Sequence, residues 1–276
     1  MKHEVDIYEK SLTKTFRMSL WSRFVKGIKE YQLLSPNDSI CVCISGGKDS
    51  IIMAKMFQIL HKYTDFPFTV KYLVMDPGYN EINLDKIKTN LKKMNIPAVI
   101  VGTNIFEVAN AQDRSPCFLC AKMRRGALYN LAKSLGCNKI ALGHHYDDVI
   151  ETTLMNMLNS GSFQTMLPKL HSTNYEGMEL IRPMYFIREK DIKRFAKVHE
   201  LDFIRCACRF TEASEEDISN SKRLETKMLI KQLLKTNPQV EKNIFQAANN
   251  VTLDMILGYK TNGEYHSFLD TYNKDK

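Results

Sequence analysis

The sequence predicts an α/β protein with a doubly wound, mostly parallel sheet of about five strands and helical appendages at both ends. Short apolar runs rich in β-branched residues alternate with stretches of helical periodicity, which is typical of βαβ units. The first apolar run leads directly into a glycine turn that opens a helix. Amphipathic stretches also stand before and after the alternating part, and we expect them to form the appendages.

Five apolar runs are predicted to be strands, and each is short enough to be buried on both faces of a parallel sheet. They cover residues 40–44, 68–75, 98–101, 139–142 and 178–182. Helices are expected at residues 49–63, 83–94, 119–135 and 189–199, with a further helix ending at residue 158. The segment 160–177 has no clear periodicity and is expected to be a long loop.

The appendages are predicted from helical spacing. Residues 12–34 carry apolar side chains on one helical face with Lys and Arg between them, so this helix should lie across the sheet domain. Residues 225–257 look helical with a break at Asn237-Pro238, and the polar tail 258–276 is expected to fray. The predicted parts are an N-terminal helical extension, a nucleotide-binding α/β domain with the cysteine site, and a C-terminal helical segment with the tail. Their boundaries are 1–36, 37–210 and 211–276.

The composition narrows the class of protein. The chain has 276 residues, of which 44% are hydrophobic and 25% charged, enough for one large domain with appendages. No apolar run reaches the length of a membrane span, and the charged N-terminus lacks the apolar core of a signal peptide, so we expect a cytoplasmic protein. The net charge of +8 and the pI of about 9.0 favour a polyanionic partner such as RNA, although a lysine-rich proteome would give the same excess.

A glycine turn follows the first predicted strand, with the sequence Ser45-Gly46-Gly47-Lys48-Asp49-Ser50. Adjacent glycines allow the backbone to approach a phosphate closely, and the N–H groups at a helix start point at an anion. Lys48 adds a positive charge, and the two serines add hydroxyl donors. The turn is shorter than a Walker loop. It predicts a phosphate site, and the alternative is an ordinary strand–helix turn.

A second strand–turn–helix carries carboxylates. It begins Gly143-His144-His145-Tyr146-Asp147-Asp148, directly after the fourth predicted strand. The carboxyl ends of parallel strands meet at one edge of a sheet, so this turn should face the glycine turn. Asp148, Glu151 and Thr152 would share one helix face. Oxygen ligands opposite Lys48 are what Mg²⁺ on a triphosphate requires.

Three other side chains at this edge have two interpretations each. His144 and His145 are either phosphate donors or scaffolding of the turn, because Mg²⁺ bound to ATP prefers oxygen ligands. Asp76 follows the second predicted strand and either contacts the nucleotide or caps its own turn.

The cysteines suggest a metal or redox centre. Cys117 and Cys120 form a C-x-x-C pair at the start of a predicted helix, where residues i and i+3 share a face, and Cys206 and Cys208 form a late C-x-C pair. Spacing alone leaves an iron–sulfur cluster, a Cys₄ zinc site and a redox dithiol open, with zinc slightly favoured. Disulfides are not expected without export. The remaining cysteines should pack as small apolar side chains: Cys41, Cys43 and Cys137.

A basic cluster follows the C-x-x-C pair on the same predicted helix: Lys122, Arg124 and Arg125. It could offset an anionic cluster or meet phosphates, or it could be a solvated helix face.

These motifs together resemble one family. SGGKDS, then SPCFLCAKMRRG, IALGHHYDDVIET, RPMYFIREKDI and a late cysteine pair resemble, in order and spacing, the tRNA 2-thiocytidine synthetases of the ATP-pyrophosphatase superfamily. The likeness runs from about Phe16 to about Val251. It implies an adenine nucleotide α-hydrolase-like fold, in which the enzyme adenylates the C2 carbonyl of an anticodon-loop cytidine and sulfur then displaces AMP.

The resemblance also implies a four-iron cluster that is held by three cysteines, which leaves one iron open. Cys117 and Cys120 match the first two ligands. For the third we favour Cys208, with Cys206 in reserve, because the chain departs from the family here. The family usually has C-x-x-C followed by Gly-Ser-Gln, whereas this chain has C-x-C followed by Arg-Phe-Thr.

The implied roles fall on the following residues. The predicted catalytic residues are Lys48, Asp49 and Asp148. The predicted cofactor-binding residues are Ser45, Gly46, Gly47, Lys48, Asp49, Ser50, Asp76, Gly143, His144 and Asp147. The predicted cluster ligands are Cys117, Cys120 and Cys208, and the cofactors are ATP, Mg²⁺ and a 4Fe–4S cluster.

The expected partners are a tRNA anticodon loop and a sulfur donor such as a cysteine desulfurase, with no membrane. A homodimer is compatible with a family that is often dimeric. Two other functions remain in view. One is a related tRNA-modifying ligase of the 2-thiouridine or lysidine type with a structural Cys₄ zinc site. The other is a non-catalytic nucleotide-binding RNA module, against which the carboxylates near the phosphate turn argue.

Overall fold

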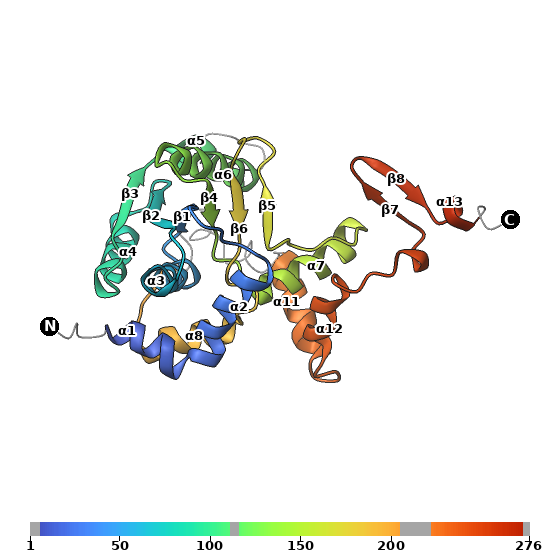
Figure 1. Ribbon diagram of the computed structural model, residues 1–276, viewed down its shortest axis with the longest axis horizontal. Coiled ribbons are helices and arrows are strands. Elements are labelled where there is room, and N and C mark those ends of the chain that lie inside the picture. The colour runs from blue at the N-terminus through green and yellow to red at the C-terminus, as the bar shows by residue number, and fades with distance from the viewer. Residues whose placement is uncertain (1–5, 111–115, 205–221, 273–276) are drawn as a thin grey trace.

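The computed structural model describes residues 6–110, 116–204 and 222–272. Six strands form its central sheet: β1 Ser39–Ile44, β2 Thr69–Asp76, β3 Ala98–Gly102, β4 Lys139–Ala141, β5 Lys169–His171 and β6 Glu179–Ile181. Their order is β3-β2-β1-β4-β6-β5 (Figure 1). All neighbours pair in parallel except β5, which is antiparallel to β6. The predicted doubly wound, mostly parallel sheet is confirmed.

Helices connect the strands and extend the chain at both ends. The N-terminal segment consists of α1 Ile7–Lys10, the π-helical turns η1 Ser11–Thr15 and η2 Arg17–Trp21, and α2 Ser22–Glu30. The sheet domain contains α3 Lys48–Tyr63, α4 Glu81–Lys93, α5 Ile105–Asn110, α6 Pro116–Ser134, α7 Tyr146–Ser160 and α8 Glu189–Val198. The C-terminal part contains α11 Lys222–Leu233, α12 Val240–Ala247, η3 Leu253–Met255, β7 Gly258–Thr261, β8 Glu264–Ser267 and α13 Leu269–Tyr272.

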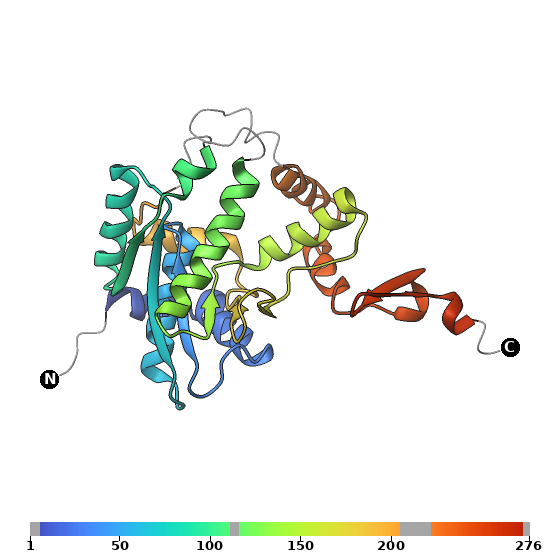
Figure 2. The same ribbon diagram turned by 90° about the horizontal axis from the view of Figure 1, so that it is seen from above.

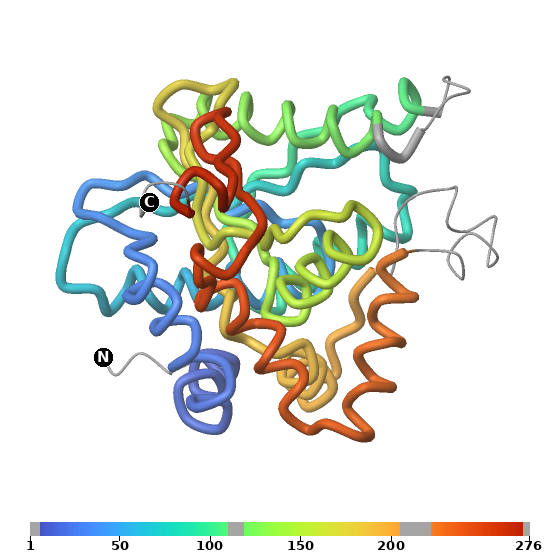
Figure 3. Tube along the Cα trace, turned by 90° about the vertical axis from the view of Figure 1, so that its right-hand side faces the viewer, coloured from blue at the N-terminus to red at the C-terminus, as the bar shows by residue number. Residues whose placement is uncertain are grey.

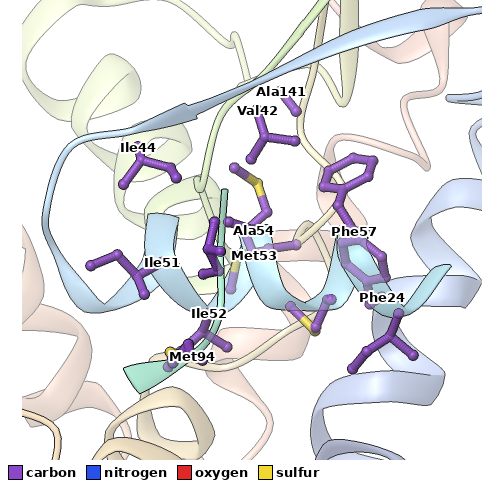
Figure 4. Packing of buried hydrophobic residues seen from close by; sticks show 14 of the residues in the cluster. Phe24, Val42, Ile44, Ile51, Ile52, Met53, Ala54, Phe57, Met94 and Ala141 are labelled. Carbon is purple, nitrogen blue, oxygen red and sulfur yellow. The ribbon is translucent and has the colours of Figure 1, made fainter. Parts of the chain in front are cut away.

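Strand β1 is buried on both faces. Val42 and Ile44 point into a large core that α3 and the N-terminal helices line (Figure 4). Cys41 and Cys43 alternate with them and point into a second core, which Tyr129 of α6 helps to form. Because side chains alternate along a strand, one short apolar run supplies both cores. The predicted packing of Cys41 and Cys43 as small apolar side chains is confirmed, as is that of Cys137.

The predicted N-terminal helix is present but is not a continuous α-helix. Leu12, Phe16, Leu20 and Phe24 recur every four residues, and each is at most 1% exposed. In an α-helix, such spacing would drift by about 40° per interval because a turn takes 3.6 residues. The wider π-helical turns η1 and η2 offset this drift. The four side chains therefore stay on the face that covers the sheet domain.

Elements in three parts of the chain were missed. The predicted loop 160–177 contains β5, so the sheet has six strands rather than about five. Helix α5 follows β3. The tail that was expected to fray instead forms the β7–β8 hairpin and α13, which project away from the sheet domain (Figures 1 and 2). Within the described ranges, no helix combines the length and apolar character needed to cross a membrane.

Candidate active site

The glycine turn joins β1 to α3 at the carboxyl edge of the sheet. Gly46 has φ of +82°, and a Cβ there would lie 2.6 Å from the Ile87 side chain, so only glycine fits. Ser45 N donates to Ser50 Oγ at 3.1 Å, and that hydroxyl donates to Gly47 O at 2.9 Å. The two serines therefore close the turn. Gly47 is the N-cap of α3 and has no side chain to cap the helix, which leaves N–H groups of the first turn available to an anion.

The second turn, between β4 and α7, packs directly on the first. A Cβ on Gly143 would lie 3.1 Å from Ser50 N, so the two backbones touch here. His145 caps α7, because Asp148 N donates to its Nδ1 at 3.4 Å and His145 N donates to Asp148 Oδ2 at 3.0 Å. Of the two interpretations of His145, the structure supports scaffolding of the turn. The cap also fixes the carboxylate of Asp148 at the sheet edge.

A cavity of about 280 Å³ lies between these two turns and α6. It is large enough for part of a nucleotide. Its lining residues are Cys43, Ile44, Ser45, Asp49, Ser50, Met75, Arg124, Leu128, Leu142, Gly143, His144 and Asp148. Six of the predicted site residues thus meet around one cavity: Ser45, Asp49, Ser50, Gly143, His144 and Asp148.

Two predicted cofactor-binding residues hold local structure instead of lining the cavity. Asp76 Oδ1 accepts hydrogen bonds from Gly78 N at 2.8 Å and Tyr79 N at 2.7 Å, which makes it the cap of its own turn. Asp147 Oδ2 accepts from Glu189 N at 2.7 Å and so fixes the start of α8. Both carboxylates therefore fix backbone segments next to the cavity.

Lys48 does not line the cavity either, and its ammonium lies between two carboxylates. Its Nζ is 3.1 Å from Asp49 Oδ2 and 3.2 Å from Glu189 Oε1. Burial lowers the pKa of Lys48, but the charges and hydrogen bonds of Asp49 and Glu189 outweigh burial and raise the pKa above its ordinary value. The lysine is therefore fully charged and stands beside the first turn of α3.

Two polar atoms in the cavity wall are buried without a hydrogen-bond partner among the described residues: Asp49 Oδ1 and His144 Nδ1. Buried polar atoms of this kind are the groups that a bound ligand or water can satisfy. Burial, followed by the charge of Arg182, lowers the pKa of His144 to about 4, so the ring is neutral at physiological pH. In the described part of the chain, no three His, Cys, Asp or Glu side chains are already arranged around a metal position.

Charged residues of α8 and α11 also reach the site, and the sequence did not single them out. Glu189 begins α8 and contacts Lys48. From α11, Arg223 lies 2.9 Å from Asp148 Oδ1, and Lys227 lies 2.7 Å from Glu189 Oε2. Glu189 belongs to the RPMYFIREKDI motif, so the family resemblance was a signal that could have pointed to it. No sequence signal pointed to the cations of α11, because Arg223 is 75 residues from Asp148 in the sequence.

The C-x-x-C pair lies in the first turns of α6. Cys120 is half-buried. Arg124 follows it by one helical turn and lines the cavity, so one face of α6 runs from the cysteine to the cavity. Arg124 was noted only as part of a basic cluster. The side chain of Cys117 and the whole of Cys206 and Cys208 lie outside the described residues.

Comparisons with known proteins agree with this site. Residues 19–212 match the model of the PP-loop domain. The tRNA-cytidine(32) 2-sulfurtransferase of Citrifermentans bemidjiense is 33% identical over 83% of this chain and 89% of its own length. The enzyme of the same name from Ralstonia pickettii is 34% identical over 84% of this chain and 72% of its own length.

A solved structure shares the fold. The U34-tRNA thiolase NcsA from Methanococcus maripaludis with its 4Fe–4S cluster superposes with a TM-score of 0.65 at 22% identity, covering 87% of this chain and 80% of that chain. At that identity the likeness shows the fold alone. The family is shown by the PP-loop match and by the curated relatives, and it confirms the resemblance read from the motifs. The chain belongs to the PP-loop family, in the branch of the tRNA-cytidine(32) 2-sulfurtransferases.

Proposed function

We propose that this protein is an ATP-dependent tRNA sulfurtransferase that converts an anticodon-loop cytidine, at position 32 as in its relatives, to 2-thiocytidine. The observation that carries the proposal is the cavity in which the glycine turn, the Asp148 turn and the C-x-x-C helix meet. A phosphate-binding turn beside a cysteine helix is what a reaction of ATP with sulfur requires. The carbonyl oxygen of the base attacks the α-phosphorus, and the bond to pyrophosphate breaks. Sulfur then bonds to C2, and AMP leaves with the oxygen.

The residues of the two turns supply the electrostatics of the first step. The uncapped N–H groups at the start of α3 are the donors for phosphate oxygens, and Ser45 and Ser50 hold the turn that presents them. Lys48 stands beside them as a full positive charge. Charge builds on the pyrophosphate as it leaves, and preorganised donors of this kind are worth about 3–4 kcal/mol each in comparable sites. The neutral ring of His144 is a further hydrogen-bonding group in the cavity wall.

Mg²⁺ fits the oxygen donors of this cavity. Asp49 Oδ1 is buried without a hydrogen-bond partner in the described chain, and Asp148 faces the same cavity. We propose these two carboxylates as the protein ligands, because Mg²⁺ prefers few carboxylates together with phosphates and water. When bound, the ion would neutralise charge on the phosphates.

A 4Fe–4S cluster fits the chemistry of the cysteine set. Cys120 stands one turn from Arg124, which lines the cavity, and Cys117 comes three residues before Cys120 in the same helix. Cys208 is proposed as the third ligand, with Cys206 in reserve. When bound, the cluster would present sulfur as a nucleophile without the use of a cysteine thiol. Arg124 is placed to orient anionic groups between the cysteines and the phosphate turn.

The proposed partners are tRNA and a sulfur donor such as a cysteine desulfurase, in the cytoplasm. The net charge of +8 supports a polyanionic substrate. The target base must leave its stack to reach the cavity, which costs less in a single-stranded loop than in a duplex.

The proposal is tested by mass spectrometry of tRNA nucleosides from a deletion strain that carries plasmid-borne variants. We expect Cys117→Ala to lose both the iron–sulfur absorbance and 2-thiocytidine but to keep ATP binding. Lys48→Ala should abolish 2-thiocytidine while the absorbance remains. Zinc in place of iron in anaerobically purified protein, or a missing modification without sulfur, would refute the proposal.

A further inference from the structure

Helix α11 is linked to Lys48 of the glycine turn through one shared carboxylate, that of Glu189. Lys227 Nζ lies 2.7 Å from Glu189 Oε2, while Lys48 Nζ lies 3.2 Å from Glu189 Oε1. Lys193, one turn further along α8, also lies 3.0 Å from Oε1. The side chain of Glu189 is 15% exposed, so these contacts are partly shielded from water. Three cations from three helices therefore share a single acidic group.

The backbone at Glu189 is fixed independently of these cations. Its N–H donates to Asp147 Oδ2 at 2.7 Å, and Arg188 pairs with the other oxygen of Asp147 at 3.4 Å. Burial raises the pKa of Glu189, but Lys227, Lys193 and Lys48 outweigh burial and hold the pKa well below its usual range. Glu189 is thus an anchored, ionised acceptor that fixes where the ammonium of Lys48 lies.

Lys227 limits how strongly Glu189 holds Lys48. An ammonium 2.7 Å from the carboxylate neutralises much of its charge, so less of that charge remains to compete with phosphate for Lys48. Lys227 also lies 3.7 Å from Glu151 Oε1, a second buried acid near the site. Without Lys227, Glu189 would still pair with Lys48 and Lys193, so more of its charge would fall on Lys48 and compete with a triphosphate. Glu151 would also lose the ammonium that faces it.

We propose that α11 completes the nucleotide site, with Glu189 and Lys227 acting as positioning residues for Lys48. The inference rests on the proposed function, because it takes ATP as the ligand that Lys48 meets. The first turns of α6 and α11 lie on the same side of the molecule (Figures 2 and 3). The C-terminal segment therefore sets the charge of the phosphate site and is more than an appendage.

The two positioning residues have opposite effects on ATP affinity. Glu189→Gln removes a negative charge beside Lys48, so the Kd for ATP should fall by about threefold. Lys227→Met removes a positive charge, so the Kd should rise by about fivefold. Both variants should lower kcat for tRNA-dependent pyrophosphate release by about tenfold, because Glu189→Gln releases Lys48 whereas Lys227→Met makes Glu189 hold Lys48 away from the phosphates. The Kd is measured by titration calorimetry with ATP.

The double variant with Glu189→Gln and Lys227→Met has the wild-type net charge. We expect its Kd for ATP to return to within about twofold of wild type while kcat stays low. Lys227→Arg should have a Kd for ATP and a kcat close to those of the wild type, since arginine keeps the positive charge. The matched control is Lys231→Met, one turn further along α11, whose exposed side chain makes no ion pair among the described residues. It should behave as wild type.

The outcomes separate this inference from the proposed function. If Glu189→Gln and Lys227→Met both weaken ATP binding, or if neither changes it, the pair only supports the fold and the inference is overturned. Thermal denaturation of each variant identifies a loss of folding. If the wild-type protein itself neither binds ATP nor releases pyrophosphate in the presence of tRNA, the proposed function fails instead.

Discussion

Gly143 lies where the two turns of the site touch. The nearest atoms to a Cβ at this position would be Ser50 N at 3.1 Å and Asp49 C at 3.2 Å, and both belong to the backbone. Backbone atoms cannot rotate away as a side chain can. Any larger residue therefore forces the glycine turn and the Asp148 turn apart by a few tenths of an ångström.

Gly143→Ala should weaken ATP binding by about tenfold and destabilise the fold by about 1–2 kcal/mol, because it separates the donors on the two turns. Titration calorimetry and urea denaturation measure these effects. The control is Gly102→Ala, because a Cβ at Gly102 meets no atom within 4 Å. An unchanged Kd in Gly143→Ala would show that the close approach of the turns is irrelevant to ATP.

His144 gives the site a pH dependence. Burial and the charge of Arg182 lower its pKa from 6.5 to about 4; the charges of Arg223 and His145 add to this, and only Asp148 opposes it. Between these two pH values the unfolded chain binds a proton that the folded chain excludes. Acidification therefore favours unfolding within this window, and the associated stability is complete above pH 6.5.

We expect the free energy of unfolding to fall by about 1–2 kcal/mol between pH 6.5 and pH 4 on account of His144, with allowance for its partial exposure. In His144→Asn this part of the pH dependence should disappear. Urea denaturation of both proteins across the window measures the difference. If the free energy of unfolding changed equally with pH in both proteins, the proposed effect of His144 on stability would be wrong.

At the level of single residues, the sequence predicted where the cavity lies better than it predicted the role of each side chain. It found Ser45, Asp49, Ser50 and Asp148 because chemistry at the carboxyl edge of a parallel sheet follows from strand order. It could not decide what Asp76 does, since an aspartate after a strand serves equally as a turn cap or a ligand. That choice depends on nearby N–H groups, which only the folded chain shows.

Among the secondary-structure elements, the long apolar segments were the easiest to predict. Helix α3 and strands β1 and β2 lie within one residue of their predicted ends, because each contains a clear run of apolar residues. Strand β5 was missed because only three residues pair, at the antiparallel edge of the sheet. A short edge strand keeps a largely exposed, loop-like sequence.

The C-terminal hairpin was missed for a related reason. Strands β7 and β8 have four residues each, and no residue in them or in α13 is buried. The turn Asn262-Gly263 has positive φ at both residues, which is typical of a tight hairpin and was a readable signal. Backbone pairing forms this element, because little apolar packing is available to it.

Removal of residues 253–276 should leave the stability of the sheet domain unchanged. Ile230 is the last buried residue among those described, so the truncation removes no core side chain. We expect a Tm within about 2 °C of the full chain and an unchanged Kd for ATP. Differential scanning calorimetry measures the first value. A fall in Tm of about 5 °C or more would show that residues 253–276 pack on the sheet domain.

At the scale of the whole molecule, the site is assembled from distant parts of the chain. The glycine turn comes from residues near 45, the carboxylate turn from residues near 148, and the cations that pair with the site's carboxylates from α11 near residue 225. Glu189 joins these parts by contact with Lys48 and Lys227. The N-terminal and C-terminal helices thus have different tasks, since the first covers the core and the second contacts the site.

The sequence by itself determined the sheet, the glycine turn, the cysteine helix and the family. These features depend on local patterns: alternating apolar runs, glycines where a side chain cannot fit, and cysteines at helical spacing. Only the tertiary structure decided which charges meet. Lys48 lies against Glu189, and Asp148 against Arg223, because folding brings together groups that are far apart in the chain. Electrostatic interactions depend on distance in space, and a linear pattern does not contain that distance.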